Sequence, residues 1–387
     1  MSFLRTLSTR TLILLITAVV LLATGGAAIA VAAGGGGQTP PAKPLDEAIR
    51  AALAAPAPEG VTARVRFTNK LFPSGALLGG VGSALMSGAS GRLWATNDGR
   101  GRVELQSDAG DVQIVWNRSH VSVYDASSNT VYRADLPKHE QAADKREPPA
   151  IGAIDRLLGT VGAHVSLSPA QPTDVAGHPA YELSLSPKHD GGLLASAALA
   201  WDAESGVPLR AAIFAQGSGS PVLELAVTGI SYGSVPSADV DVTPPAGTKV
   251  VDVGSPTRDA SPDTKGVTGL PAVQAAAPFA VTAPATLVGL PRRDVRLVGA
   301  GDSKAALALY GHGLGAITLV ERKADSARPA NGMAAGLPTI SLDGVTAHEL
   351  ATQLGTVLEW QRAGTSYLLA GSLPAAAAEA AGRQLLK

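Results

Sequence analysis

The chain has 387 residues, a formal net charge of −1 at pH 7 and no cysteine. Its near-neutral charge, without a basic block or tail, argues against a nucleic-acid-binding protein. The lack of cysteine excludes disulfides, thiol chemistry, cysteine-ligated metal sites and the lipid-modified cysteine of a lipoprotein. A chain of this length can hold two ordinary domains with flanking segments.

Residues 1–33 predict export across the cytoplasmic membrane. Arg5 and Arg10 precede an uncharged, apolar run at 11–33, and this order of charge and apolar residues is typical of an export signal. Two interpretations remain open. A cleavable signal peptide would end at a small-x-small site such as AIA at 28–30. An uncleaved anchor would instead span the bilayer with the whole run, for which roughly 20 apolar residues are enough.

Composition divides the rest of the chain into two predicted domains. Residues 34–44 and 254–269 are rich in glycine, proline or polar residues and have no hydrophobic period, which is typical of linkers. They delimit a larger predicted domain at 45–253 and a smaller α+β domain at 270–387.

The larger domain opens with the pattern of an amphipathic helix at 43–55 and of a long strand at 60–72. Residues 73–91 are apolar but interrupted by glycines, so we expect a mobile apolar loop there. At 91–137, short runs alternate between apolar and polar residues and end at turn signals such as Asn-Asp-Gly. This alternation predicts an antiparallel meander with one apolar and one polar face.

Further strand patterns follow a second helical pattern at 150–158 and continue to residue 251. The sequence therefore predicts about nine mostly antiparallel strands and two or more helices in the larger domain. In the smaller domain, strand patterns at 296–321 and 340–370 precede a closing helix at 373–386. The dipeptide Ala363-Gly364 predicts a hairpin turn between two of these strands.

Three short motifs formally suggest chemistry, and none has the context that its chemistry needs. GHGLGA at 311–316 fits a dinucleotide fingerprint, but strand-like residues follow where a helix is required, which predicts a glycine-rich hairpin. His348 and Glu349 begin a zinc-protease motif, but Thr352 stands where the second histidine would be. Ser303 lies in a nucleophile-like turn without suitable partners. We therefore expect no enzyme, no metal site and no cofactor.

The remaining candidates are the apolar side of the large predicted sheet and the glycine-hinged loop beside it. For most of these residues, ordinary core packing is the simpler interpretation. However, large apolar residues on a loop are costly unless they lie on a membrane, on a ligand or at the mouth of a sheet. A lid over an apolar cavity explains both features and predicts these lipid-binding residues: Val65, Phe67, Leu71, Leu77, Leu78, Val81, Leu85, Met86, Leu93, Val103, Leu105, Ile114, Trp116, Val121 and Val123.

The order of these elements resembles the LolA/LppX/RseB superfamily over residues 45–253. The segments VELQSDAGDVQIVW and VYDASSNTVYRADLP carry the resemblance, together with the proline-rich VTPPAGTKV. Within the superfamily, the chain is most similar to actinobacterial proteins described as outer-membrane lipoprotein carriers or as MucB/RseB-like regulators. The C-terminal LEWQRAGTSYLLAGSLP is similar to a small domain of related exported proteins.

The resemblance implies an α+β fold with a large antiparallel open half β-barrel, which short helices cover and whose concave face holds acyl chains. It also implies two alternative roles. A carrier would shield lipid or a lipidated protein in transit, and it must diffuse, which an uncleaved anchor would prevent. A sensor would bind lipid or lipidated protein and regulate a membrane anti-sigma factor by protein contact. We therefore expect an exported, non-enzymatic binding protein that is anchored in the membrane or secreted after cleavage.

Overall fold

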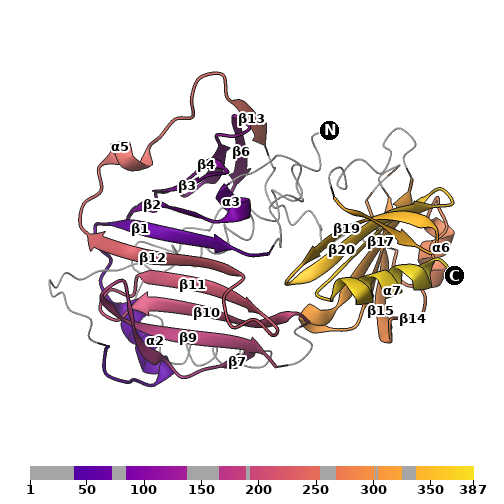
Figure 1. Ribbon diagram of the computed structural model, residues 1–387, viewed down its shortest axis with the longest axis horizontal. Coiled ribbons are helices and arrows are strands. Elements are labelled where there is room, and N and C mark those ends of the chain that lie inside the picture. The colour runs from indigo at the N-terminus through magenta and orange to yellow at the C-terminus, as the bar shows by residue number, and fades with distance from the viewer. Residues whose placement is uncertain are drawn as a thin grey trace.

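The computed structural model describes residues 39–71, 84–136, 165–188, 192–252, 267–299, 301, 304–324 and 337–387. The predicted export segment, most of the predicted apolar loop and the predicted helix at 150–158 lie outside these residues. The described chain forms two β-sheet units that lie side by side (Figure 1). Whether these units are independent domains with the expected boundaries stays a prediction.

Thirteen strands form the first sheet. They are β1 (Gly60–Asn69), β2 (Ala89–Thr96), β3 (Gly101–Ser107), β4 (Gly110–Trp116), β5 (His120–Asp125), β6 (Thr130–Asp135), β7 (Val165–Leu167), β8 (Gln171–Val175), β9 (His178–Pro187), β10 (Leu194–Asp202), β11 (Pro208–Ala215), β12 (Leu223–Tyr232) and β13 (Lys249–Asp252). The helices described in this unit are α2 (Leu45–Ala54), α3 (Ala84–Ser87) and α5 (Ser237–Val240).

The first sheet is open, as the half-barrel expectation requires. Its strand order is β13-β6-β5-β4-β3-β2-β1-β12-β11-β10-β9-β7, with β8 added beside β9. Neighbouring strands are antiparallel except that β13 runs parallel to β6. The expected count of about nine strands is too low, in part because β7, β8 and β13 have only three, five and four residues. Runs this short carry too little alternation to be recognised.

The expected loop at 73–91 is wrong over its described part. Residues Ala84–Ser87 form the short helix α3, and β2 begins at Ala89. Asn69 ends β1 and holds α3, because its Nδ2 donates to the Leu85 carbonyl at 2.7 Å and its Oδ1 accepts from the Leu71 amide at 2.9 Å. Ala84 and Leu85 are buried against the sheet. Ala84, Leu85 and Met86 are good helix formers, but a helix of four residues is not stable by itself, so packing on the sheet decides that it forms.

The second sheet has eight strands in the order β14-β15-β16-β17-β21-β20-β19-β18. Their bounds are β14 (Thr286–Leu287), β15 (Leu290–Val298), β16 (Ala305–Tyr310), β17 (Ile317–Lys323), β18 (Thr339–Leu342), β19 (Val345–Thr352), β20 (Gly355–Arg362) and β21 (Thr365–Gly371). The helical elements are α6 (Leu270–Ala276), the 3₁₀ turn η3 (Gly313–Gly315) and α7 (Ala375–Leu385). Helix α7 packs on β20 and β21 through Ala378, Ala381 and Leu385.

Two local predictions in this unit are confirmed. Ala363 and Gly364 connect β20 to β21 with positive φ angles of 49° and 77°, as a two-residue hairpin turn requires. The GHGLGA segment connects antiparallel strands β16 and β17 and includes only η3, so it is a glycine-rich hairpin. The helix that a dinucleotide site needs does not follow it.

Contacts between the two units involve the turn from β19 to β20. The Gln353 Nε2 donates to the Lys70 carbonyl at 2.8 Å, and Leu354 packs against the cluster that contains Leu71 and Val222. The Ser372 hydroxyl accepts from the Leu193 amide at 2.9 Å and donates to the Leu354 carbonyl at 2.7 Å. One serine therefore connects both units.

Candidate lipid-binding face

One face of the first sheet is apolar from strand to strand. Cross-strand pairing places one row of side chains on β5, β4, β3, β2 and β1, in the order Val123, Ile114, Val103, Leu93 and Ala63. A second row contains Val112, Leu105, Gly91, Val65 and Val227. The face continues across the remaining strands through Leu225, Ala211, Leu199 and Leu183. It thus extends without a charged residue in these rows from β5 to β9.

Gly91 shows how closely the strands approach beside this face. A Cβ at residue 91 would lie 1.7 Å from the Glu104 carbonyl oxygen on β3. Only glycine fits where two backbones come so close, and such positions let a sheet coil. The local sequence SGRLW therefore places its glycine where β2 comes into close contact with the backbone of β3.

The structure brings most of the predicted binding residues into one cluster. Its buried members include Val65, Leu85, Val103, Leu105, Ile114, Trp116, Val121 and Val123, and the half-buried Phe67 and Leu93 pack against it. Leu71 belongs to a different cluster, at the contact with the second unit. Met86 lies half-buried in α3. Leu77, Leu78 and Val81 lie outside the described residues.

Several members of this cluster are not among the lipid-binding residues predicted from the sequence. They are Val61, Ala63, Ala84, Ala89, Val112 and Tyr132, with Leu225, Val227, Ile230 and Tyr232 packed against them. The alternation of β12 shows its apolar side, but not that β12 pairs with β1 across more than 150 residues of sequence. The β12 residues therefore depend on the global fold, whereas Val61, Ala63 and Val112 share the local alternation of Val65 and Ile114 and could be identified from it.

The apolar face is closed by packing. The eight buried predicted residues of the cluster are each 2–6% exposed. Helix α3 contacts β1, β3 and β4 at this face. Helix α2 covers the β9–β10 end, where Ala48 joins a cluster with Tyr181 and Trp201. A ligand would therefore have to displace side chains rather than fill an open groove.

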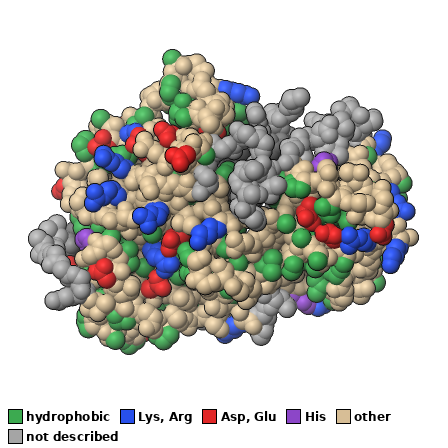
Figure 2. Space-filling model, viewed as in Figure 1, with side chains coloured by type: hydrophobic (Ala, Val, Ile, Leu, Met, Phe, Trp, Pro, Cys, Tyr) green, Lys and Arg blue, Asp and Glu red, His purple; other side chains and the backbone are tan. Residues whose placement is uncertain are grey.

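The opposite face of the same sheet is charged. Arg210 on β11 pairs with Glu182 at 2.6 Å and with Glu224 at 2.7 Å. Arg102 on β3 bonds Glu104 and lies 5.1 Å from the centre of the Trp94 ring. Figure 2 shows Lys, Arg, Asp and Glu side chains gathered on the viewed face of this unit. The sheet is therefore strongly two-sided.

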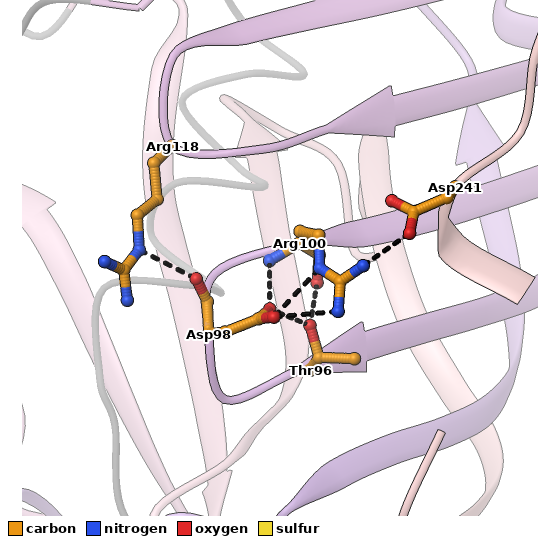
Figure 3. Close-up of polar contacts among 5 residues, drawn as sticks. All are labelled: Thr96, Asp98, Arg100, Arg118 and Asp241. Carbon is orange, nitrogen blue, oxygen red and sulfur yellow. Dashed lines mark hydrogen bonds and ion pairs between the residues drawn. The ribbon is translucent and has the colours of Figure 1, made fainter. Parts of the chain in front are cut away.

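A polar cluster holds the turn between β2 and β3 (Figure 3). The Asp98 carboxylate accepts from the Thr96 hydroxyl and from the backbone and side chain of Arg100. Hydrogen bonding by the Arg100 side chain, with that of Thr96, lowers the pKa of Asp98 to about 2. Arg118 donates to the Asp98 carbonyl, and Arg100 pairs with Asp241 beside α5. These bonds connect the turn between β2 and β3 to Arg118, which follows β4, and to Asp241, which follows α5.

A second polar network contains Asp, His, Tyr and Ser side chains, which are residue types that many catalytic sites use. Asp202 is 3% exposed, and its Oδ2 accepts from the Tyr232 hydroxyl at 2.9 Å and lies 3.3 Å from His178 Nδ1. Its Oδ1 accepts from the backbone amides of Glu204 and Ser205. Burial raises the pKa of Tyr232. The Ser205 hydroxyl donates to Tyr232 rather than to the histidine, so these bonds close the β10–β11 turn.

No group of three or more His, Asp or Glu side chains within the described ranges is arranged to hold a metal ion. None of the helices described there is both long and apolar enough to cross a membrane.

No protein-family model matches the chain, and no curated protein matches it. Several solved structures do. A chain of the Pseudomonas aeruginosa MucA/MucB complex is 15% identical, with 87% of this chain and 94% of that chain covered and a TM-score of 0.41. An uncharacterised conserved protein from Thermus thermophilus is 13% identical, with 54% and 96% covered and a TM-score of 0.33. A LolA superfamily protein from Nitrosomonas europaea is 10% identical, with 52% and 99% covered and a TM-score of 0.23.

MucB and LolA superfamily proteins, the two kinds that the sequence resemblance names, are thus both among the matched structures. At these identities the likeness concerns the fold alone.

Proposed function

We propose that the chain is an extracytoplasmic protein that binds the acyl chains of lipid or lipoprotein on the apolar face of its first sheet, without catalysing a reaction. The observation that supports this proposal is the continuity of that face. Apolar rows run from β5 to β9, while charged side chains occupy the opposite side of the same strands. A long, unbranched hydrocarbon chain is the ligand whose shape and chemistry match such rows.

The proposed entry point is the position of α3. This helix has four residues and is held by the bond from Asn69 to the Leu85 carbonyl, so it is a small element to displace. Exposing one leucine side chain costs roughly 1.5–3 kcal/mol, whereas burial of each methylene contributes roughly 0.8 kcal/mol. About ten buried methylenes therefore outweigh the displacement of Leu85. A bound acyl chain would take the place of α3 and contact the strand side chains that α3 covers.

A second function, regulation of a membrane anti-sigma factor by protein contact, is favoured by the join between the two units. Phe67 packs against both the apolar cluster of the face and the cluster of Leu71 and Val222. Leu354 of the second unit packs against that latter cluster. If a ligand displaces side chains on the apolar face, Phe67 would transmit the change in packing to the cluster that contacts the second unit. A pull-down with lipid-loaded chain should then recover a single-pass anti-sigma factor, and Leu354→Ala should weaken that recovery.

Photo-crosslinking tests the primary proposal. The full chain is incubated with a phospholipid whose acyl chain carries a diazirine, irradiated and mapped by peptide mass spectrometry. We expect adducts on residues of the apolar rows, such as Val103, Leu105 and Ile114, and none on Glu104 or Gln113 between them. Adducts spread equally over both faces, or found only in the second sheet, would contradict the proposal.

A further inference from the structure

Three exposed arginines lie together on the polar face of the first sheet. Arg64 on β1 is directly opposite Arg92 on β2, and Arg66 follows two residues after Arg64 on the same face. The Arg64 guanidinium lies over Gly229 on β12, because a Cβ at residue 229 would be 3.0 Å from its Nη2. We call Arg64, Arg66 and Arg92 the arginine patch.

The neighbouring carboxylates on this face are already engaged. Glu182 and Glu224 both pair with Arg210, and Glu104, which is opposite Arg92, bonds Arg102 instead. No ion pair or hydrogen bond from the arginine patch is present among the described residues. Like charges directly opposite each other across two strands are unfavourable. Within the part of the chain that the structure describes, the positive charge of the patch therefore has no ion-pair partner.

Two aromatic side chains lie on the same face and are half-buried. Trp94 follows Arg92 by two residues on β2 and stacks with Arg102. Phe214 lies beside Arg210, whose guanidinium carbon is 6.0 Å from the ring centre. Arginines beside a tryptophan are typical of surfaces that meet the headgroup region of a bilayer, since guanidinium groups match phosphate and the indole ring suits the interface.

We propose that the arginine patch docks the first sheet, polar face inward, on an anionic phospholipid surface. Charge complementarity and the neighbouring aromatics identify the occupant, and a broad sheet surface fits a bilayer better than a single extended peptide does. This surface is separate from the acyl-binding face on the other side of the sheet. Three arginines near an anionic bilayer strengthen its association by on the order of 100-fold, and salt weakens the effect.

The natural lack of cysteine allows a site-specific test on the full chain. Ser90→Cys places one thiol opposite Arg66, and Ser341→Cys places one on β18 of the second sheet as a control, both at exposed positions. Each is labelled with an environment-sensitive fluorophore and reconstituted with phosphatidylcholine vesicles, with or without phosphatidylglycerol. If the N-terminal segment attaches the chain to the vesicle, that attachment is common to both labelled variants, so a difference between them reports local contact.

We expect the fluorophore emission of Ser90→Cys to shift to the blue only when phosphatidylglycerol is present, and that of Ser341→Cys not to shift. The response should be lost in 1 M salt, where the Debye length is about 3 Å. The variant R64Q/R66Q/R92Q should lose the response, whereas R293Q/K323Q/K387Q, with the same charge change at exposed positions of the second unit, should keep it. Equal responses in both vesicles, equal responses at both labels, or a response only to soluble polyglutamate would overturn the proposal. The last outcome would assign the patch to an acidic peptide.

Discussion

The indole ring of Trp116 on β4 lies against the backbone of Gly101 on β3, its direct cross-strand partner. A Cβ at residue 101 would be 2.1 Å from Trp116 Cζ2 and 2.5 Å from Cε2. Such contacts do not occur between real side chains, so the ring occupies the space that the glycine leaves. An aromatic side chain over a cross-strand glycine is a known way to stabilise a pair of strands. Here it places Trp116 in the apolar cluster with 6% of its surface exposed.

We expect Gly101→Ala to displace the Trp116 ring and lower the free energy of unfolding by about 1–3 kcal/mol, as overpacking does. The emission of Trp116 should shift to the red, and photo-crosslinking of lipid to β3 and β4 should fall. Gly219→Ala is the matched control, because a Cβ at residue 219 has no neighbour within 4 Å. Urea unfolding followed by fluorescence would contradict the account if the two variants behaved alike.

Arg64→Gln should stabilise the protein in the absence of membranes, because the cross-strand partners of Arg64 are Arg92 and Gly229, whereas Arg92 also faces Glu104. It removes the like-charge pair of Arg64 and Arg92, which are opposite each other on β1 and β2, and the gain should be roughly 0.2–1 kcal/mol. Arg210→Gln should do the opposite, because Glu182 and Glu224 would lose their partner. Urea unfolding at low salt measures both changes. A loss of stability in Arg64→Gln would mean that the arginine patch has partners within the protein.

Gly192→Ala should loosen the contact between the two units. A Cβ there would lie 2.4 Å from the Ser372 carbonyl oxygen and 2.6 Å from its hydroxyl. The bond from the Leu193 amide to the Ser372 hydroxyl should then break, and hydrogen exchange at the Leu193 amide should speed up markedly. Gly177→Ala controls for backbone strain, since Gly177 also has positive φ but no neighbour within 4 Å. Unchanged exchange at Leu193 would show that the contact tolerates the added methyl group.

The Asp98 cluster should give the protein a specific loss of stability in acid. The folded-state pKa of Asp98 is depressed from 3.8 to about 2, mainly by hydrogen bonding from Arg100. The contribution of Asp98 to the free energy of unfolding is therefore fully present above pH 3.8 and is lost as the pH falls through about 2. Because Asp98 is exposed, the effect should stay below about 1 kcal/mol. Asp98→Asn should flatten this part of the pH–stability curve, and a curve parallel to that of the unmodified chain would rule out the contribution.

Much of the first sheet can be predicted from sequence because short local patterns, the turn signals and the alternation of apolar and polar residues, specify its strands. Turn signals such as Asn97-Asp98-Gly99 end each strand of the meander, and alternation shows which side chains share a face. Val103, Leu105 and Ile114 therefore fall into one cluster, as expected. The site itself, as a place where lipid binds, stays a prediction.

Other features depend on contacts between distant segments and could not be predicted. Helix α3 is too short to be stable by itself, and it forms because Asn69 and the sheet hold it. The parallel pairing of β13 with β6 joins residues more than 100 positions apart. Leu71 was expected at the apolar face, but β1 ends at Asn69, so Leu71 lies at the contact with the second unit instead. The arginine patch likewise emerges only when the registers of β1, β2 and β12 are known.

Native mass spectrometry of the full chain, released gently from the membranes of the cells that produce it, tests the central claim most directly. We predict a bound species with the mass of a phospholipid or lipoprotein acyl chain, which Gly101→Ala should reduce and Gly219→Ala should leave unchanged. Lipid identified in the gas phase should reappear in solvent extracts of the same sample. A folded chain that carries no lipid after such release, and takes up none when lipid is added, would contradict the claim that this apolar face binds acyl chains.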